Sequence, residues 1–92
     1  YAPEVEAALQ KHEAVAEVAV IGVPDSLRGE TVKAFVVLRE DASTSAEDLR
    51  YFAREHLAHF KVPQSIEIRL TLPKNRTGKI DKELLKSEVL IK

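Results

Sequence analysis

A short segment near the C-terminus concentrates the residues of this chain that could do chemistry. The sequence Lys-Asn-Arg-Thr-Gly-Lys, from Lys74 to Lys79, contains three cations, whereas the 92-residue chain carries a formal net charge of −1. The rigid ring of Pro73 precedes the segment, and Gly78 permits backbone conformations that other residues avoid. A long, flexible ammonium suits a carboxylate or a phosphate. We therefore expect a mobile loop that presents Lys79 to an anionic group, with the apolar Ile80 as an anchor behind it.

The elements that must position this loop follow from hydrophobic spacing and turn residues. They are a helix over 3–12, strands over 15–23 and 32–38 joined by a turn at 26–30, a helix over 46–57, a strand over 65–70, and a last helix after residue 81. The first two strands are expected to pair antiparallel. The first is apolar almost throughout, which predicts burial on both of its faces. The order αββαβα predicts an α+β fold, a small sheet of about three strands covered by helices.

Local signals place the ends and the buried faces of the helices. Ser45 is expected to cap the middle helix, with Asp48 at the third position, and Asp81 is expected to cap the last helix. The buried stripe of the last helix is predicted to consist of Leu84, Leu85 and Val89.

Composition limits the classes of function. There is no cysteine, which excludes a disulfide framework, a thiol nucleophile and a thiolate metal site. His12, His56 and His59 are expected to have structural roles, so no metal site is predicted. No apolar run approaches the roughly 20 residues of a membrane helix and no signal peptide opens the chain, which favours a cytoplasmic setting. Because the chain begins at Tyr1 and not at methionine, we expect it to be part of a longer protein.

Short motifs spread over nearly the whole chain resemble those of one known family. They are Pro3-Glu4-Val5-Glu6, Val20-Ile21-Gly22-Val23-Pro24-Asp25, Arg28-Gly29-Glu30, Lys61-Val62-Pro63, Leu72-Pro73-Lys74, Thr77-Gly78-Lys79-Ile80 and Leu84. Each motif is weak alone, but together and in this order they resemble the small C-terminal domain of the adenylate-forming enzymes. That family includes acyl-CoA synthetases, peptide-synthetase adenylation domains and luciferases.

The resemblance implies that residues 1–92 form one C-terminal lid domain of a two-domain enzyme. The N-terminal domain, which binds ATP with Mg²⁺ and the acid, and the hinge would both lie outside this chain. Lys79 would enter the active site for adenylation, and Gly78, Thr77, Lys74 and Arg76 would form its supporting loop. A positioned cation can stabilise the negative charge that accumulates when a carboxylate attacks the α-phosphorus. On composition alone, Lys79 is more often a solvated surface lysine, so its catalytic role rests on the family match.

In this family the lid then rotates and helps to form the tunnel for the thiol acceptor. Arg54 would meet the phosphates of coenzyme A, although a surface arginine is the simpler interpretation. Gly22 would allow close backbone approach near the tunnel, although a β-bulge or a strand end is simpler. The partners implied are the enzyme's own N-terminal domain, a carboxylic acid, ATP and CoA. The isolated chain is expected to bind none of these small molecules and to have no ligase activity.

Two alternatives stay open beside an AMP-forming carboxylic or fatty acid:CoA ligase. Asn75 to Lys79 is more similar to acyl-CoA synthetases than to peptide-synthetase domains, in which asparagine more often precedes the Gly-Lys pair. At the position of Lys82, acyl-CoA synthetases often carry arginine, which keeps the charge. A peptide-synthetase adenylation domain is therefore the first alternative. The second is a non-catalytic module that binds an anion or a nucleic acid; an aromatic content of 5% and the balanced charge argue against a nucleic-acid partner.

Overall fold

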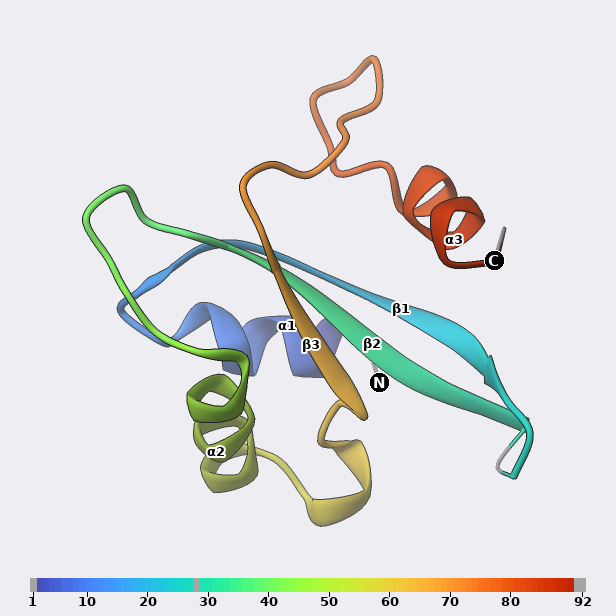
Figure 1. Ribbon diagram of the computed structural model, residues 1–92, viewed down its shortest axis with the longest axis horizontal. Coiled ribbons are helices and arrows are strands. Elements are labelled where there is room, and N and C mark those ends of the chain that lie inside the picture. The colour runs from blue at the N-terminus through green and yellow to red at the C-terminus, as the bar shows by residue number, and fades with distance from the viewer. Residues whose placement is uncertain (1, 28, 91–92) are drawn as a thin grey trace.

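The order of helices and strands is the predicted one, with one addition. The computed structural model describes residues 2–27 and 29–90; Arg28, which belongs to the predicted turn and to one of the motifs, lies outside the described residues. The elements are α1 (Ala2–Gln10), β1 (Val15–Asp25), β2 (Gly29–Leu38), α2 (Ala46–His56), the 3-10 helix η1 (His59–Lys61), β3 (Ser65–Arg69) and α3 (Lys82–Leu90) (Figure 1). The α+β class and the order αββαβα are confirmed, and η1 is the element that the sequence did not predict.

The sheet has three strands, and β2 lies at its centre. β1 pairs with β2 antiparallel, as predicted, with Val20 opposite Ala34. β3 lies on the other side of β2 and runs parallel to it, with Ile66 opposite Ala34. A parallel neighbour requires a long crossover between the strands, and α2 with η1 forms that crossover. The hairpin ladder continues to Asp25 opposite Gly29, so the turn is shorter than the predicted segment 26–30.

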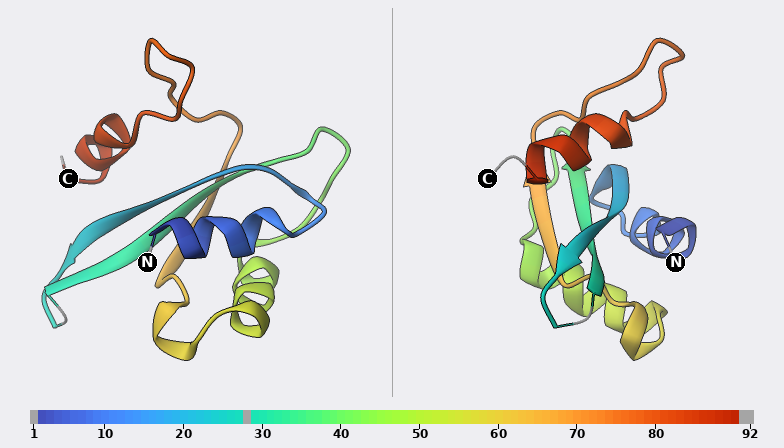
Figure 2. Two further views of the ribbon diagram at one scale, coloured as in Figure 1. Left: turned by 180° about the vertical axis from the view of Figure 1, so that it is seen from behind. Right: turned by 90° about the vertical axis from the view of Figure 1, so that its right-hand side faces the viewer.

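Alternate residues of β1 are buried on opposite faces of the sheet. The first hydrophobic cluster joins α1 and α2 to one face, through Val5, Leu9, Val15, Val18, Val20, Ala34, Val36, Leu49, Ala53 and Ile66. The second cluster joins α3 and the preceding loop to the other face, through Ala19, Ile21, Phe35, Leu72 and Leu85. Figure 2 shows the sheet between α1 and α3. The prediction that the first strand is buried on both faces is therefore confirmed.

Both predicted helix caps are present, but of the three residues of the predicted buried stripe Leu85 is buried, Val89 is partly buried and Leu84 is exposed. Ser45 Oγ accepts a hydrogen bond from Asp48 N at 3.1 Å, and Asp81 Oδ1 accepts one from Leu84 N at 3.0 Å. In α3, Leu85 is fully buried, whereas Leu84 is 46% exposed. Adjacent residues of a helix point about 100° apart. Since α3 packs on the sheet through one side, Leu85 faces the core and Leu84 does not.

Candidate functional site

The segment that carries Lys79 is a loop closed at its base. Lys74 and Ile80 form an isolated antiparallel bridge, and Asp81 N donates a hydrogen bond to Pro73 O at 2.8 Å. Leu72 is buried in the second hydrophobic cluster, and Ile80 packs against that cluster. Figure 1 shows the loop between β3 and α3, standing away from the sheet. The predicted apolar anchor behind Lys79 is therefore present, and the loop rises from a fixed base.

Hydrogen bonds inside the loop converge on Asn75. Its side-chain oxygen Oδ1 accepts from Thr77 N at 2.9 Å, from Thr77 Oγ1 at 2.7 Å and from Lys79 N at 3.1 Å. Its backbone N donates to Lys79 O at 2.8 Å, and its backbone O accepts from Gly78 N at 3.0 Å. Gly78 has φ = 85°, a left-handed conformation that glycine adopts without the steric penalty of a side chain. The conformation of the backbone at Lys79 is thus set by its neighbours in the loop.

The cations of this region differ in whether a carboxylate holds them. Lys74 Nζ lies 3.0 Å from Glu17 Oε1, and Lys82 Nζ lies 2.6 Å from Glu6 Oε2. Lys79 is exposed, and within residues 2–27 and 29–90 no ion pair holds its ammonium. Lys79 can therefore meet an external anion, whereas Lys74 fixes the base of the loop to β1.

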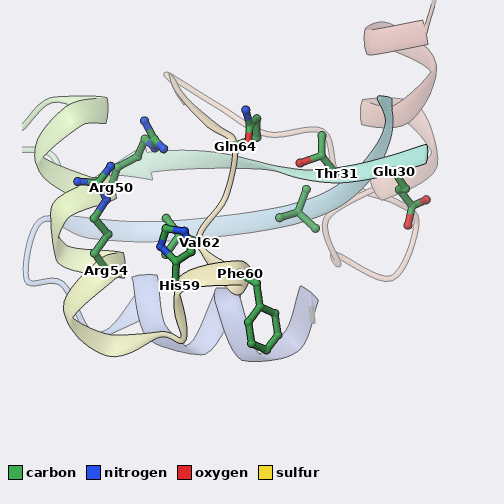
Figure 3. A pocket seen from close by; sticks show the side chains of 9 residues that line it. Glu30, Thr31, Arg50, Arg54, His59, Phe60, Val62 and Gln64 are labelled. Carbon is green, nitrogen blue, oxygen red and sulfur yellow. The ribbon is translucent and has the colours of Figure 1, made fainter. Parts of the chain in front are cut away.

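A second candidate region is a hollow of about 540 Å³ beside α2, lined from β2, α2, η1 and the segment before β3. Arg50 and Arg54, one helical turn apart on α2, both line it, and Figure 3 shows their guanidinium groups near one end of the hollow, with Glu30 at the other end. The Nε atom of Arg50 is buried and has no hydrogen-bond partner in the described part of the chain. The Arg54 guanidinium lies 5.3 Å from the ring centre of Tyr51. Paired guanidinium groups of this kind suit a phosphate.

Gly22 does not line this hollow, but Glu30 on the facing strand lines the hollow and also approaches Gly22. A Cβ atom at Gly22 would lie 2.8 Å from the carboxyl carbon of Glu30, which is one of the lining residues. The pairing of Gly22 with Val32 is regular, and the irregularity of the ladder lies between Val15 and Glu17. The interpretation of Gly22 as a bulge or a strand end is therefore wrong.

The structure does not bring the two candidate regions together. The loop between β3 and α3, which carries Lys79, and the helix α2 lie at opposite ends of the domain (Figures 1 and 2). Arg54 belongs to α2, and α2 and η1 line the hollow.

Two of the three histidines pack on an aromatic ring. The ring of His56 stacks on Phe52 with centroids 4.2 Å apart, and His12 meets the same ring edge-on at 4.8 Å. His59 lines the hollow. Among residues 2–27 and 29–90, no group of three or more His, Cys, Asp or Glu is placed to hold a metal ion. None of the helices in those ranges has the length and apolar character needed to cross a membrane.

Two residues of these regions were not singled out from the sequence. Asn75 was detectable in principle, since asparagine often accepts a hydrogen bond from the backbone two residues later, as it does here from Thr77. Arg50 had a weaker signal, its spacing of four from Arg54 on the predicted helix.

Comparisons with known proteins agree on one kind of domain. Residues 4–79 match the family model described as AMP-binding enzyme C-terminal domain. A long-chain-fatty-acid–CoA ligase of Bacillus subtilis (strain 168) is 54% identical over 88 residues, which are 96% of this chain and 16% of that ligase. ATP-bound MatB from Rhodopseudomonas palustris superposes with a TM-score of 0.90 at 33% identity, over 96% of this chain and 18% of that one. A Mycobacterium tuberculosis fatty acyl CoA synthetase gives 0.88 at 34% identity, over 96% and 17%. The chain thus spans less than a fifth of each of these relatives.

Proposed function

The chain belongs to the AMP-binding enzyme C-terminal domain family, and from this premise we propose that it is the mobile lid of an AMP-forming carboxylic or fatty acid:CoA ligase. The observation that carries the proposal is the exposed ammonium of Lys79 on a hydrogen-bonded loop, which no carboxylate in the described part of the chain holds. The relatives support the choice of reaction, because one at 54% identity is a long-chain-fatty-acid–CoA ligase and two at 46% are an acetyl-coenzyme A synthetase and a crotonobetaine/carnitine–CoA ligase.

The proposed reaction has two half-reactions, of which Lys79 serves the first. The carboxylate of the acid attacks the α-phosphorus of ATP, the bond from that phosphorus to the bridging oxygen breaks, and the acyl-adenylate and pyrophosphate form. A Mg²⁺ held outside this chain would screen the charge of the pyrophosphate. Negative charge accumulates on the oxygens around that phosphorus in the transition state. The ammonium of Lys79, delivered by closure of the domain, would stabilise this charge and position the acid. Gly78, Thr77 and Lys74 would hold the loop in shape, and Arg76 would add positive charge at its tip.

The second half-reaction would use the opposite end of the domain. The thiol of CoA attacks the acyl carbon, the thioester forms, and AMP leaves. After rotation of the domain, Arg54 would contact a phosphate of CoA. Arg50, which lines the same hollow, would offer a second guanidinium group to that phosphate. Glu30, which covers Gly22, would need to move for a ligand to reach that glycine. The separation of Lys79 from Arg54 supports a domain that presents one region in each half-reaction.

The decisive experiment measures each half-reaction in the full-length parent enzyme. Acid-dependent exchange of pyrophosphate into ATP reports adenylation, and release of AMP from pre-made acyl-adenylate and CoA reports thioester formation. Lys79→Ala is expected to lower exchange roughly 10²–10³-fold, as expected for loss of one charge-stabilising group. Thioester formation should remain within about twofold of the wild-type rate.

The control is Lys86→Ala, which removes an exposed lysine of α3 outside the loop. It should leave both half-reactions unchanged. Equal losses of both half-reactions in Lys79→Ala would contradict the assignment of the lysine to adenylation. The absence of exchange in the wild type, over a broad panel of acids, would contradict the ligase itself.

A further inference from the structure

We propose that Asn75 is a positioning residue for Lys79, and that its side-chain oxygen holds the loop in the conformation used for adenylation. The inference rests on the function proposed for Lys79. It assigns Asn75 no contact with the substrates, because its amide oxygen is directed at the loop's own donors.

Asn75, at the start of the loop, forms hydrogen bonds with Lys79 at the end of the loop. Oδ1 accepts from the backbone N of both Thr77 and Lys79, at 2.9 and 3.1 Å. The backbone N of Asn75 donates to Lys79 O at 2.8 Å. The peptide groups on both sides of the Lys79 Cα atom are therefore bonded to Asn75, the preceding one through the Asn75 side chain and the following one through its backbone. The side chain of Asn75 thus holds the peptide group from which Lys79 leaves the loop.

The rest of the loop offers Lys79 little other support. Residues 74–79 are all exposed, so no core packing fixes them. The bridge between Lys74 and Ile80 fixes the base of the loop, directly before Asn75 and directly after Lys79, but it does not hold residues 76–78 or the peptide group that precedes Lys79. A loop of this kind, with exposed residues and glycine, samples other conformations when its internal hydrogen bonds are removed. Loss of the Asn75 side chain should therefore release Lys79 without disturbing the two hydrophobic clusters.

This arrangement predicts a selective defect in the full-length enzyme. Asn75→Ala should lower the rate of pyrophosphate exchange roughly 10- to 100-fold, since three hydrogen bonds of ordinary strength are lost. Thioester formation from pre-made acyl-adenylate and the melting temperature should not change. Asn75→Asp should retain more exchange than Asn75→Ala, because all three donors bind Oδ1 and a carboxylate oxygen can accept them, although its negative charge beside Lys79 should keep the rate below that of the wild type.

A matched control removes a side-chain amide elsewhere. Gln10 Nε2 donates to Val15 O and Ala16 O, both at 3.3 Å, at the end of α1. Gln10→Ala therefore removes amide hydrogen bonds of similar number without affecting the loop, and exchange should be unaffected. In the Lys79→Ala background, Asn75→Ala should lower exchange no further, because a positioning residue has nothing left to position.

The possible failures can be told apart. If Lys79→Ala abolishes exchange while Asn75→Ala leaves it unchanged, the positioning role is wrong and the proposed function stands. If Asn75→Ala lowers both half-reactions equally, or if exchange in Asn75→Asp is no faster than in Asn75→Ala, Asn75 does not act through the geometry of the loop. If Lys79→Ala leaves exchange intact, the proposed role of the lysine is itself wrong.

Discussion

The left-handed backbone at Gly78 allows a test in which two substitutions introduce the same strain at different places. Gly78 has φ = 85° and Gly29 has φ = 81°, and these are the glycines with positive φ among the described residues. A Cβ atom at either position would meet nothing within 4 Å. Alanine at each site therefore introduces backbone strain without a steric clash.

The strain sets the size of the expected effect. A left-handed conformation costs a non-glycine residue about 1–2 kcal/mol, so both Gly78→Ala and Gly29→Ala should lower the free energy of unfolding by up to that amount. This is roughly a 5- to 30-fold change in the folding equilibrium. At Gly78 the strain can also be relieved by a change of loop conformation, because the loop can return φ to negative values if the hydrogen bond from Gly78 N to Asn75 O is broken. That relaxation would displace Lys79, the next residue.

The two readouts separate these effects. Urea unfolding of the 92-residue chain should show a loss for Gly29→Ala and an equal or smaller loss for Gly78→Ala. Pyrophosphate exchange by the full-length enzyme should fall only in Gly78→Ala. Equal loss of exchange in both variants would refute the argument that the loop geometry matters, since strain alone would then explain it. No change of stability or exchange in Gly78→Ala would refute the strain itself.

Two further predictions concern the core and the hollow. Leu85→Ala should lower the free energy of unfolding by about 2–5 kcal/mol, because this leucine is fully buried. Leu84→Ala, at a side chain that is 46% exposed, should lower it by less than about 1 kcal/mol. Urea unfolding of both variants measures these losses, and equal losses would contradict the packing of α3. Arg54→Ala should raise the KM for CoA several-fold and leave pyrophosphate exchange unchanged in the full-length enzyme; a change in exchange would contradict the division of the two half-reactions between the two ends of the domain.

The features that follow local rules could be predicted from the sequence. The apolar run of β1 indicated burial on two faces, because a strand alternates its side chains and both sets here are apolar. Ser45 and Asp81 were recognisable as caps because short polar side chains satisfy the free N–H groups of a first helical turn. The order αββαβα could also be predicted from the spacing of apolar and turn residues. These features could be predicted without knowing which surfaces of the elements pack together.

The features that depend on tertiary packing could not be predicted in the same way. Leu84 and Leu85 have the same chemistry, and only the angle at which α3 meets the sheet decides which one is buried. The hollow combines β2, α2, η1 and the segment before β3, which come together only in the folded domain. The role of Asn75 depends on a loop closed by the bridge between Lys74 and Ile80, a contact that no local pattern reveals.

The sharing of β1 between the two hydrophobic clusters has a mechanical consequence. Ala19 and Ile21 belong to one cluster and Val18 and Val20 to the other, so neither layer can be pulled off without exposing the strand that the other layer needs. We expect a torque applied at one end of the domain to move both layers together, because they share this strand. In the proposed rotation the domain would act as a lever whose arm includes the Lys79 loop, and the displacement of the loop tip would increase with its distance from the axis of rotation.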